Sequence, residues 1–432
     1  MSRVHTPTPE QLAKAEARRL KKEQAKKITA EAPKTPVDDS RARILPREWL
    51  ELHQPGNGGL SLRVMTWNLL AQTLVRRELF PTSDCLKAAQ REHMIYNEIL
   101  SHRAAICCLQ EVDRTEKLFP ELERAGYACK HGCLIAYRAA AFECVRRRVV
   151  AYDEQEVRAA DRVLDEGSTR KGSSFRTKNI ANVVALQRRD APDEGVIVAT
   201  THLFWHPRTH KLHPPPEVAK FRAEGGDAQS RWPCIIAGDF NFGPDDAAYS
   251  LLVGDPLLPA QKAMLERSRV VHASIDPSVP QTGKPEEEDP DPDPDRVIVN
   301  ARRARPPTGC SPTRSSSASS ARPSTGAPPT SAYDAGMRTV PSLADRQLTF
   351  GSRATVDGAR RGANEPVYTS YTHYWQAVLD YIFVLDAPGR GVTVEGLAAP
   401  HPAEAFGEGL PRKGVCGSDH ISLAADLHWP SA

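Results

Sequence analysis

The chain has 432 residues, of which 26% are charged and 40% are apolar, so it is long enough to bury the core of one large α/β domain with appended segments. Its 57 basic and 54 acidic side chains leave a net charge of +3 and a pI near 8.3, which excludes the strongly basic composition, with a pI above about 9, of many nucleic-acid domains. Nine scattered cysteines without a C-x-x-C pair argue against a disulfide scaffold and a structural zinc site.

The first 43 residues form a polar segment with a basic cluster between residues 14 and 27. Strong helix formers dominate it but no apolar stripe runs along it, so we predict a basic N-terminal tail that is disordered or a solvated helix. Such a cluster is typical of a nuclear address or of an arm that attracts phosphate. No apolar run reaches the ~18 residues of a membrane span, and the start lacks a secretion signal. We expect an intracellular protein, in the nucleus or nucleolus, the cytoplasm or both, without a membrane partner.

Short apolar runs, separated by polar segments, begin near residue 60 and have the length of strands rather than helices. The candidate strands are residues 62–67, 105–109, 133–137, 183–187, 196–201, 234–237, 377–385 and 420–427. Helical patterns fall among them at residues 88–100, 116–125 and 245–252. This mixture predicts an α/β (α+β) domain of packed layers over residues 44–428.

The regular spacing of apolar residues disappears between residues 276 and 363. The acidic run 286–295 precedes a Ser-, Pro- and Arg-rich stretch, 302–331, which has too few large apolar residues to offset the entropy of ordering it. Because strand-like segments return afterwards, we interpret residues 276–363 as a low-complexity, largely disordered insertion within the domain.

Polar side chains stand where several of the apolar runs stop or begin. These residues are Asn68, Gln110, Glu111, Thr201, His202, Asp239, Asn241, Ser418, Asp419 and His420. Side chains at strand ends sit on a rigid frame and face one rim of a sheet, which suits a preorganised site. The last three share that rim if their strand runs antiparallel to the others.

The residue types fit the cleavage of phosphate esters. Carboxylates and amides are hard oxygen ligands that suit Mg²⁺ or Mn²⁺, whereas zinc and copper favour sulfur and imidazole. Phosphodiester cleavage depends mainly on positioning and on neutralising charge, which a cation on Glu111 would provide. Asp380 lies in an apolar run, where a carboxylate is costly unless it is paired, and a histidine would be a suitable partner.

Six segments resemble, in the same order, the motifs of the endonuclease/exonuclease/phosphatase superfamily. They read LRVMTWNLLAQ, LQEVD, THLFWHP, AGDFNFGPDD, YTSYTHYW…LDYIFV and GSDHISL, within residues 44–270 and 364–428. They are similar to the branch of nocturnin, the carbon-catabolite-repressor-type deadenylases and the fungal RNA exonucleases, and look most like the last. The resemblance implies a DNase I-like four-layer sandwich, two packed β-sheets flanked by helices, that hydrolyses phosphate esters with Mg²⁺.

The resemblance also implies which residues surround the metal. Glu111 would be the principal ligand. Asn68 beside it would contact the metal or the phosphate, and Asp419 would complete the shell of the metal or of its water.

Further residues would act on the water and the phosphate. Asp239 would orient and deprotonate the attacking water, and Asn241 would hold that water or a phosphate oxygen. His420 would donate to the phosphate as charge develops, and Asp380 would fix its ring. His202 would touch the scissile phosphate from the opposite side.

Simpler structural alternatives exist for these residues. Asn68, Gln110 and Asn241 could cap strand ends, and Glu111 and Asp239 could be surface carboxylates. Asp380 and His420 could form a buried structural pair.

The histidines at positions 202, 206, 210 and 213 also invite a zinc interpretation. Prolines at 207 and 214–216 argue against the continuous helix that this spacing needs. Ser418, Asp419 and His420 are not a nucleophilic triad, because adjacent residues of an extended chain point to opposite faces.

One segment departs from the family pattern. Residues 208–231 usually carry a longer helix, and here the segment is short and interrupted by three consecutive prolines. We therefore expect weaker helical cover at this place.

The resemblance implies RNA as the substrate, shortened from its single-stranded 3′ end in the 3′-to-5′ direction, with poly(A) tails or ribosomal RNA precursors as candidates. We expect a monomer, without the leucine-rich repeats that dock relatives to a deadenylase complex. Two alternatives stay open. One is a small-molecule or nucleotide phosphatase of the same superfamily, and the other is a catalytically weakened RNA-binding protein.

Overall fold

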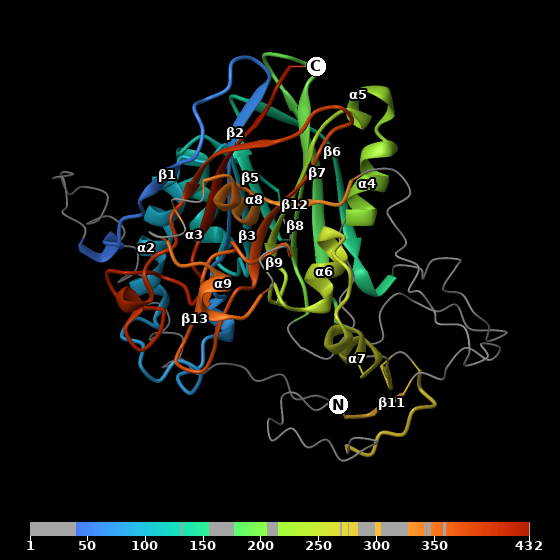
Figure 1. Ribbon diagram of the computed structural model, residues 1–432. Coiled ribbons are helices and arrows are strands. Elements are labelled where there is room, and N and C mark those ends of the chain that lie inside the picture. The colour runs from blue at the N-terminus through green and yellow to red at the C-terminus, as the bar shows by residue number, and fades with distance from the viewer. Residues whose placement is uncertain are drawn as a thin grey trace, which may run out of the picture. The chain divides into compact units, whose positions relative to one another are not determined.

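Figure 1 shows the computed structural model, in which the described residues are 40–130, 133–154, 177–204, 215–267, 270–274, 276–283, 299–303, 327–340, 343, 347–356 and 360–431. The chain divides into two compact units, Met1–Ser40 and Arg41–Ala432. Residues 1–39 of the predicted basic tail lie outside the described residues. Both sheets and the helices that cover them belong to the second unit.

The first sheet has seven strands, and its central pair β2 and β3 is parallel whereas all other neighbours are antiparallel. In spatial order the strands are β1 (Trp49–Glu51), β16 (Thr393–Ala398), β17 (Leu423–Trp429), β2 (Leu60–Asn68), β3 (Ile106–Gln110), β5 (Leu134–Arg138) and β4 (Tyr127–Lys130). The last strand of the chain, β17, thus runs antiparallel to β2, as the predicted rim requires.

The second sheet has six strands, of which only β8 and β9 are parallel neighbours. Their order is β12 (Thr330–Ser331), β15 (Asp380–Leu385), β9 (Cys234–Asp239), β8 (Gly195–His202), β7 (Ile180–Arg188) and β6 (Phe142–Ala151). Two small antiparallel pairs lie apart from the sheets: β10 (Val270–His272) with β11 (Ala301–Arg303), and β13 (Ser370–Tyr371) with β14 (Gln376–Ala377).

The inner faces of the two sheets pack against each other and form the central core. Alternate residues of each strand face the partner sheet, because the side-chain period of a strand is two. They include Val64, Ile106, Cys108 and Ile135 from the first sheet and Val184, Val198, Ile235, Ala237 and Ile382 from the second. The residues between them are buried under helices, so these strands read as unbroken apolar runs in the sequence.

Helices cover the outer face of each sheet (Figure 1). α2 (Ala88–Ser101) and α3 (Thr115–Arg124) pack on the first sheet, where Ile95 and Ile99 of α2 lie one turn apart on its buried face. α4 (Pro215–Ala223) and α6 (Ala247–Val253) pack on the second sheet. The result is the expected four-layer sandwich of two packed sheets flanked by helices.

The remaining helices are short. They are α5 (Gly226–Ser230), α7 (Pro259–Arg267), α8 (Ala332–Thr339), α9 (Phe350–Arg353) and the 3₁₀ turns η1 (Ser40–Ala42), η2 (Gln72–Leu74), η3 (Tyr152–Glu154) and η7 (Ala403–Phe406). No helix among the described residues has the length and apolar character needed to cross a bilayer.

All the candidate strands and helices occur, with small shifts of their ends. The sequence pattern missed β6, an edge strand that pairs only with β7 and leaves Arg147 and Val149 exposed. The sequence also led us to expect weak helical cover over residues 208–231. Pro215 and Pro216 instead occupy the first turn of α4, where a proline removes no helical hydrogen bond. Helical cover is therefore present at this face, through Val218 and Phe221.

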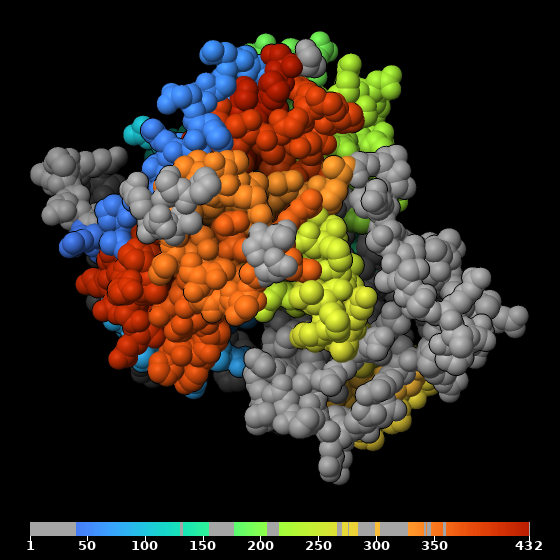
Figure 2. Space-filling view, viewed as in Figure 1, coloured from blue at the N-terminus to red at the C-terminus, as the bar shows by residue number. Residues whose placement is uncertain are grey.

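Part of the predicted insertion, residues 276–363, belongs to the core. β12 pairs with β15, and Tyr333 of α8 is 1% exposed and donates its hydroxyl to the carbonyl of Ala398 at 2.8 Å. The structure differs here from the expected disorder because Tyr333 and Met337, one turn apart, give a short helix its apolar stripe. In Figure 2 the orange surface of the segment that follows borders the yellow-green atoms of α6. There Arg360 donates to the Ser250 hydroxyl at 2.9 Å.

A buried carboxyl group, Glu365, ties this segment to α6. The Tyr249 hydroxyl donates to Glu365 Oε1 at 2.7 Å, and the Glu365 carbonyl accepts from the Phe350 amide at 2.8 Å. Burial, and then the neighbouring charge of Asp334, raise the pKa of Glu365 to about 8. Glu365 is therefore protonated in the folded protein at neutral pH.

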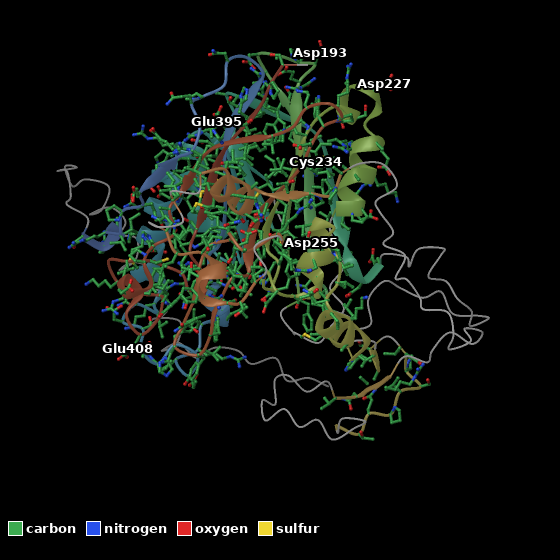
Figure 3. The ribbon with its side chains drawn as sticks, in the orientation of Figure 1. Asp193, Asp227, Cys234, Asp255, Glu395 and Glu408 are labelled. Carbon is green, nitrogen blue, oxygen red and sulfur yellow. The ribbon has the colours of Figure 1, made fainter. Side chains whose placement is uncertain are left out.

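Replacing Glu365 with glutamine should change how stability depends on pH. The folded protein keeps this proton to about pH 8 whereas the unfolded chain releases it near 4.5, so the free energy of unfolding of the wild type falls as pH rises through this window. Relative to wild type, the free energy of unfolding of Glu365→Gln should rise by on the order of 4 kcal/mol between about pH 5 and about pH 8.5, measured by urea unfolding. Glu408→Gln, at the exposed site labelled in Figure 3, is the control, and equal pH dependence of both variants would contradict the expectation.

Candidate active site

Three adjacent strands of the second sheet place polar residues in one row across their ends. Asp239 of β9 is the register partner of Asp380 on one side and of His202 on the other. Each continues the inward-facing alternation of its strand, for example Ile235, Ala237 and then Asp239. The row therefore points from the second sheet towards the first.

Gly238 allows these strands to approach closely. A Cβ atom at this position would lie 2.1 Å from the carbonyl oxygen of Thr201, its register partner on β8. No other residue type could stand immediately before Asp239 without separating the two strands.

The first sheet contributes a matching row from β2 and β3, in which Asn68 and Gln110 are register partners. The Gln110 amide donates to the hydroxyls of Thr66 at 3.1 Å and Thr200 at 2.9 Å, so it joins the two sheets directly beneath the site. Glu111 follows Gln110 and is the first residue beyond the strand.

The Asn68 side chain connects the two rows. Its amide nitrogen donates to Glu111 Oε1 at 2.9 Å and to Asp239 Oδ2 at 3.0 Å, while its oxygen accepts from the Leu70 amide at 3.0 Å. The nitrogen, and not the oxygen, therefore faces the carboxylates. Asn68 is 1% exposed, so these bonds are made away from bulk water.

Glu111 is held in an unusual backbone conformation. Its φ is +55°, and Leu70 in the neighbouring loop has a similar φ of +56°. Left-handed values of φ in non-glycine residues cost of order 1–3 kcal/mol each. The Ala71 amide donates to Glu111 Oε2 at 2.8 Å, so both carboxylate oxygens accept hydrogen bonds from the same loop. These two donors fix the orientation of the Glu111 carboxylate.

The segment Ser418 to His420 joins the site from the beginning of the last strand. The Ser418 hydroxyl donates to the Asn68 carbonyl at 2.7 Å, and Trp67 Nε1 donates to the His420 carbonyl at 2.8 Å. Asp419 is 5% exposed, and burial raises its pKa. This third segment thus lies directly on the end of β2.

His420 and Asp380 form a buried pair. His420 Nδ1 lies 2.8 Å from Asp380 Oδ2, and Asp380 is 0% exposed. Burial lowers the pKa of His420, but Asp380, Asp419 and Asp239 together outweigh it and raise that pKa well above its ordinary value. His420 is therefore a cationic donor at neutral pH, and its Nε2 lies 3.8 Å from Asp239 Oδ2.

His202 and Asn241 flank Asp239 on its other sides. His202 Nε2 lies 3.5 Å from Asp239 Oδ2, and its Nδ1 lies 3.9 Å from Glu111 Oε1. Asn241 donates its backbone amide to Asp239 Oδ1 at 3.0 Å and its side-chain amide to the Leu203 carbonyl at 2.8 Å. All the predicted site residues are thus brought together around Asp239, and the histidines at 206, 210 and 213 lie outside the described residues.

Among the described residues, one set of histidine and carboxylate side chains has ligand atoms close enough together for a cation. Ligand atoms of Asp239, Asp380 and His420 lie within 4.8 Å of one another. A protonated imidazole has no lone pair for a metal, so His420 suits a phosphate oxygen better than a cation. Glu111 and Asp239 present carboxylate oxygens to one shared donor, Asn68, and such oxygens suit Mg²⁺ or Mn²⁺.

The sequence pattern missed residues that support the site without lying in a motif. The Asn179 amide donates to the His202 carbonyl at 2.8 Å, and Arg91 of α2 contacts the loop after Asn68. Arg91 had a detectable signal, because it is a charged residue on the same face of the helix as Met94, Ile95 and Glu98, all of which are buried.

Similar proteins include several named for RNA cleavage. The chain is 28% identical to a probable RNA exonuclease of Schizosaccharomyces pombe and 26% identical to RNA exonuclease NGL2 of Saccharomyces cerevisiae, in each case over 97% of this chain and 88% of the relative. Carbon catabolite repressor protein 4 homolog 4 of Arabidopsis thaliana is 25% identical over 50% of this chain and 61% of its own length.

Solved structures agree on the fold. The human Nocturnin catalytic domain with bound sulfate superposes with a TM-score of 0.50 at 19% identity, covering 89% of this chain and 97% of that chain. ANGEL2, a 2′,3′-cyclic phosphatase, has a TM-score of 0.50 at 17% identity, covering 90% of this chain and all of that chain.

The family model called Endonuclease/Exonuclease/phosphatase family matches residues 65–420, a range that contains every residue of the site described above. The chain belongs to the endonuclease/exonuclease/phosphatase family.

Proposed function

We propose that the domain formed by residues 44–428 is a Mg²⁺-dependent phosphodiesterase that shortens single-stranded RNA from its 3′ end. The observation that carries the proposal is the arrangement around Asp239, where carboxylates, an amide and two imidazoles from both sheets meet. The names of the relatives that match 97% of the chain support RNA rather than a small molecule as the substrate.

Asp239 is the group that would act on the attacking water. Its Oδ1 accepts from the Asn241 amide and its Oδ2 accepts from Asn68, which fixes the direction of the carboxylate. It is 2% exposed, so a water at this place would meet few competing solvent molecules. Asn68 and Asn241 orient the base, and Asp239 receives the proton of the water as the new bond to phosphorus forms.

His420 and His202 would act on the phosphate. His420 carries its charge because Asp380 holds its Nδ1, so Nε2 is left to donate to a non-bridging oxygen on which charge develops. His202 faces Asp239 from the neighbouring strand and would contact the phosphate from the other side. Two donors, one at the end of β8 and the other held by the buried Asp380, lower the barrier without reorganising during the reaction.

Glu111, with Asp419 beside it, would hold the metal. A bound Mg²⁺ would neutralise phosphate charge and stabilise the leaving oxygen. The side-chain amide of Asn68 and the backbone amide of Ala71 fix both oxygens of Glu111 before any cation arrives. Such preorganisation is typical of metal sites whose ligands are supported by further hydrogen bonds.

A substrate panel should separate this function from its alternatives. Labelled poly(A), mixed-sequence RNA, single-stranded DNA and a 2′-phosphorylated dinucleotide are each incubated with Mg²⁺ or with EDTA. We expect ladder-like shortening of RNA from the 3′ end with Mg²⁺ and none with EDTA. Phosphate release from the dinucleotide alone would support a phosphatase instead, and RNA binding without turnover would support an RNA-binding protein.

Removing either half of the proposed machinery should abolish most of the activity. Glu111→Gln and His420→Asn should each lower kcat/KM on RNA by about 10²–10³-fold, because each removes one charged group from the transition state. Circular dichroism and thermal unfolding check that both variants fold. Glu408→Gln and His53→Asn, at exposed positions, are the matched controls. Activity within a few-fold of wild type in either site variant would reject these roles.

A further inference from the structure

Arg91 is a charged residue in the apolar layer between α2 and the first sheet. It is 2% exposed and lies on the helix face that carries Met94 and Ile95. A buried guanidinium is costly unless its donors are satisfied, and such groups persist where their hydrogen bonds have a purpose. The partners of Arg91 therefore indicate what it does.

The guanidinium of Arg91 is directed at backbone carbonyls of two loops. Its Nη2 donates to the carbonyls of Leu69 at 2.5 Å and Leu70 at 2.6 Å, and its Nε donates to the Gly417 carbonyl at 2.6 Å. Nη1 donates to the Gln72 side chain at 3.3 Å. The planar fork thus clamps residues 69–72 and residue 417 to α2.

The first clamped loop is the one that holds Glu111. Leu69 and Leu70 lie between Asn68 and Ala71, which donate to the two carboxylate oxygens of Glu111 at 2.9 Å and 2.8 Å. Leu70 has a φ of +56°, a conformation that favours glycine. Arg91 binds the carbonyl of this residue, so it stabilises the turn that aims the Ala71 amide at Glu111.

The second clamped loop leads to His420. Gly417 precedes Ser418, whose hydroxyl donates to the Asn68 carbonyl at 2.7 Å. A Cβ atom at Gly417 would lie 2.9 Å from the Ile95 side chain and 3.0 Å from the Arg91 carbonyl, so this loop rests directly on α2. Arg91 therefore sits where the two loops meet, and it does not itself contact Glu111, Asp239 or His420 through any hydrogen bond among those of the described residues.

We propose that Arg91 is a positioning residue that sets the orientation of the Glu111 carboxylate and thereby the affinity of the site for its divalent cation. The proposal rests on the proposed function in taking Glu111 as the metal ligand. Arg91 acts through the backbone of residues 69–71, in the way that supporting hydrogen bonds orient the ligands of other metal sites.

Arg63 offers a matched comparison for a role in stability alone. It also lies on the first sheet and uses its guanidinium as a fork, towards Asp426 at 2.7 Å and 2.6 Å and towards the His102 carbonyl at 3.1 Å. Arg63 pairs across β2 and β17 at the end of β2 that is remote from Asn68. Its loss should weaken the fold without altering the loop after Asn68.

The experiment compares Arg91→Lys and Arg63→Lys in the full chain. Lysine keeps the charge but cannot bridge three carbonyls with a planar fork. Binding of Mn²⁺ to the RNA-free protein is measured by electron paramagnetic resonance. The Mg²⁺ concentration that gives half-maximal RNA cleavage is measured separately. Thermal unfolding reports the stability of each variant.

We expect Arg91→Lys to weaken Mn²⁺ binding and to raise the half-maximal Mg²⁺ concentration by about 10–100-fold, with most of kcat restored at saturating Mg²⁺. Arg63→Lys should lower Tm but keep both metal values within about twofold of wild type, which is the scatter expected for an uncoupled site. Gln72→Ala, which removes one acceptor of Arg91 and leaves the arginine in place, should weaken Mn²⁺ binding by a few-fold even if Arg91→Lys does not fold.

Equal Mn²⁺ affinity in Arg91→Lys and Arg63→Lys would overturn the proposal. So would wild-type affinity in Gln72→Ala when Arg91→Lys is unfolded, or a wild-type protein that binds no Mn²⁺. If Mn²⁺ binding weakens as expected while no variant or wild type cleaves RNA, the role of Arg91 stands and the assignment of RNA as substrate fails.

Discussion

The constraint on which this structure depends is the burial of several carboxylates close together. Glu111, Asp239, Asp380 and Asp419 converge where the two sheets meet, and like charges in a region of low dielectric repel strongly. Three of them, Glu111, Asp239 and Asp380, are compensated by fixed donors. Asn68 bridges Glu111 and Asp239, backbone amides of Ala71 and Asn241 serve one oxygen each, and the imidazolium of His420 serves Asp380. The same surroundings that tolerate these charges would prepare them for the cation and the phosphate that we propose as ligands of the site.

The period of the strands explains how a core becomes a site. Along β9 the residues that face the first sheet run Ile235, Ala237 and Asp239, so one strand carries apolar packing and reactive chemistry on the same face. Because both sheets change from apolar to polar at the same end, the site needs no separate scaffold. Gln110 marks this change, since its amide joins Thr66 and Thr200 across the two sheets.

Much of this arrangement could be predicted from the sequence, for physical reasons that differ between parts. Strands buried on both faces give unbroken apolar runs, and the polar residues that end them, such as Asn68 and Asp239, are visible at once. The edge strand β6 was missed because Arg147 and Val149 share one exposed face while Arg146 and Arg148 share the half-buried face, so apolar and polar residues do not alternate along it. The sequence did not predict α8, because its apolar stripe consists of only Tyr333 and Met337 and lies in a part of the chain with low average hydrophobicity. The role of Arg91 could not be predicted, because its partners are backbone carbonyls far along the chain.

The positions of the last strands bear on how the chain reaches this state. β15 and β17 are the final strands of their sheets in sequence, yet each lies inside its sheet, beside β9 and β2 respectively. While the polypeptide emerges from the ribosome, one edge of β2 and one edge of β9 therefore keep unpaired backbone hydrogen-bonding groups until β17 and β15 have been synthesised. Non-local pairing of this kind makes folding slow and leaves apolar edges open to self-association in the meantime. Pairing of β15 with β9 and of β17 with β2 is thus the step that closes both sheets.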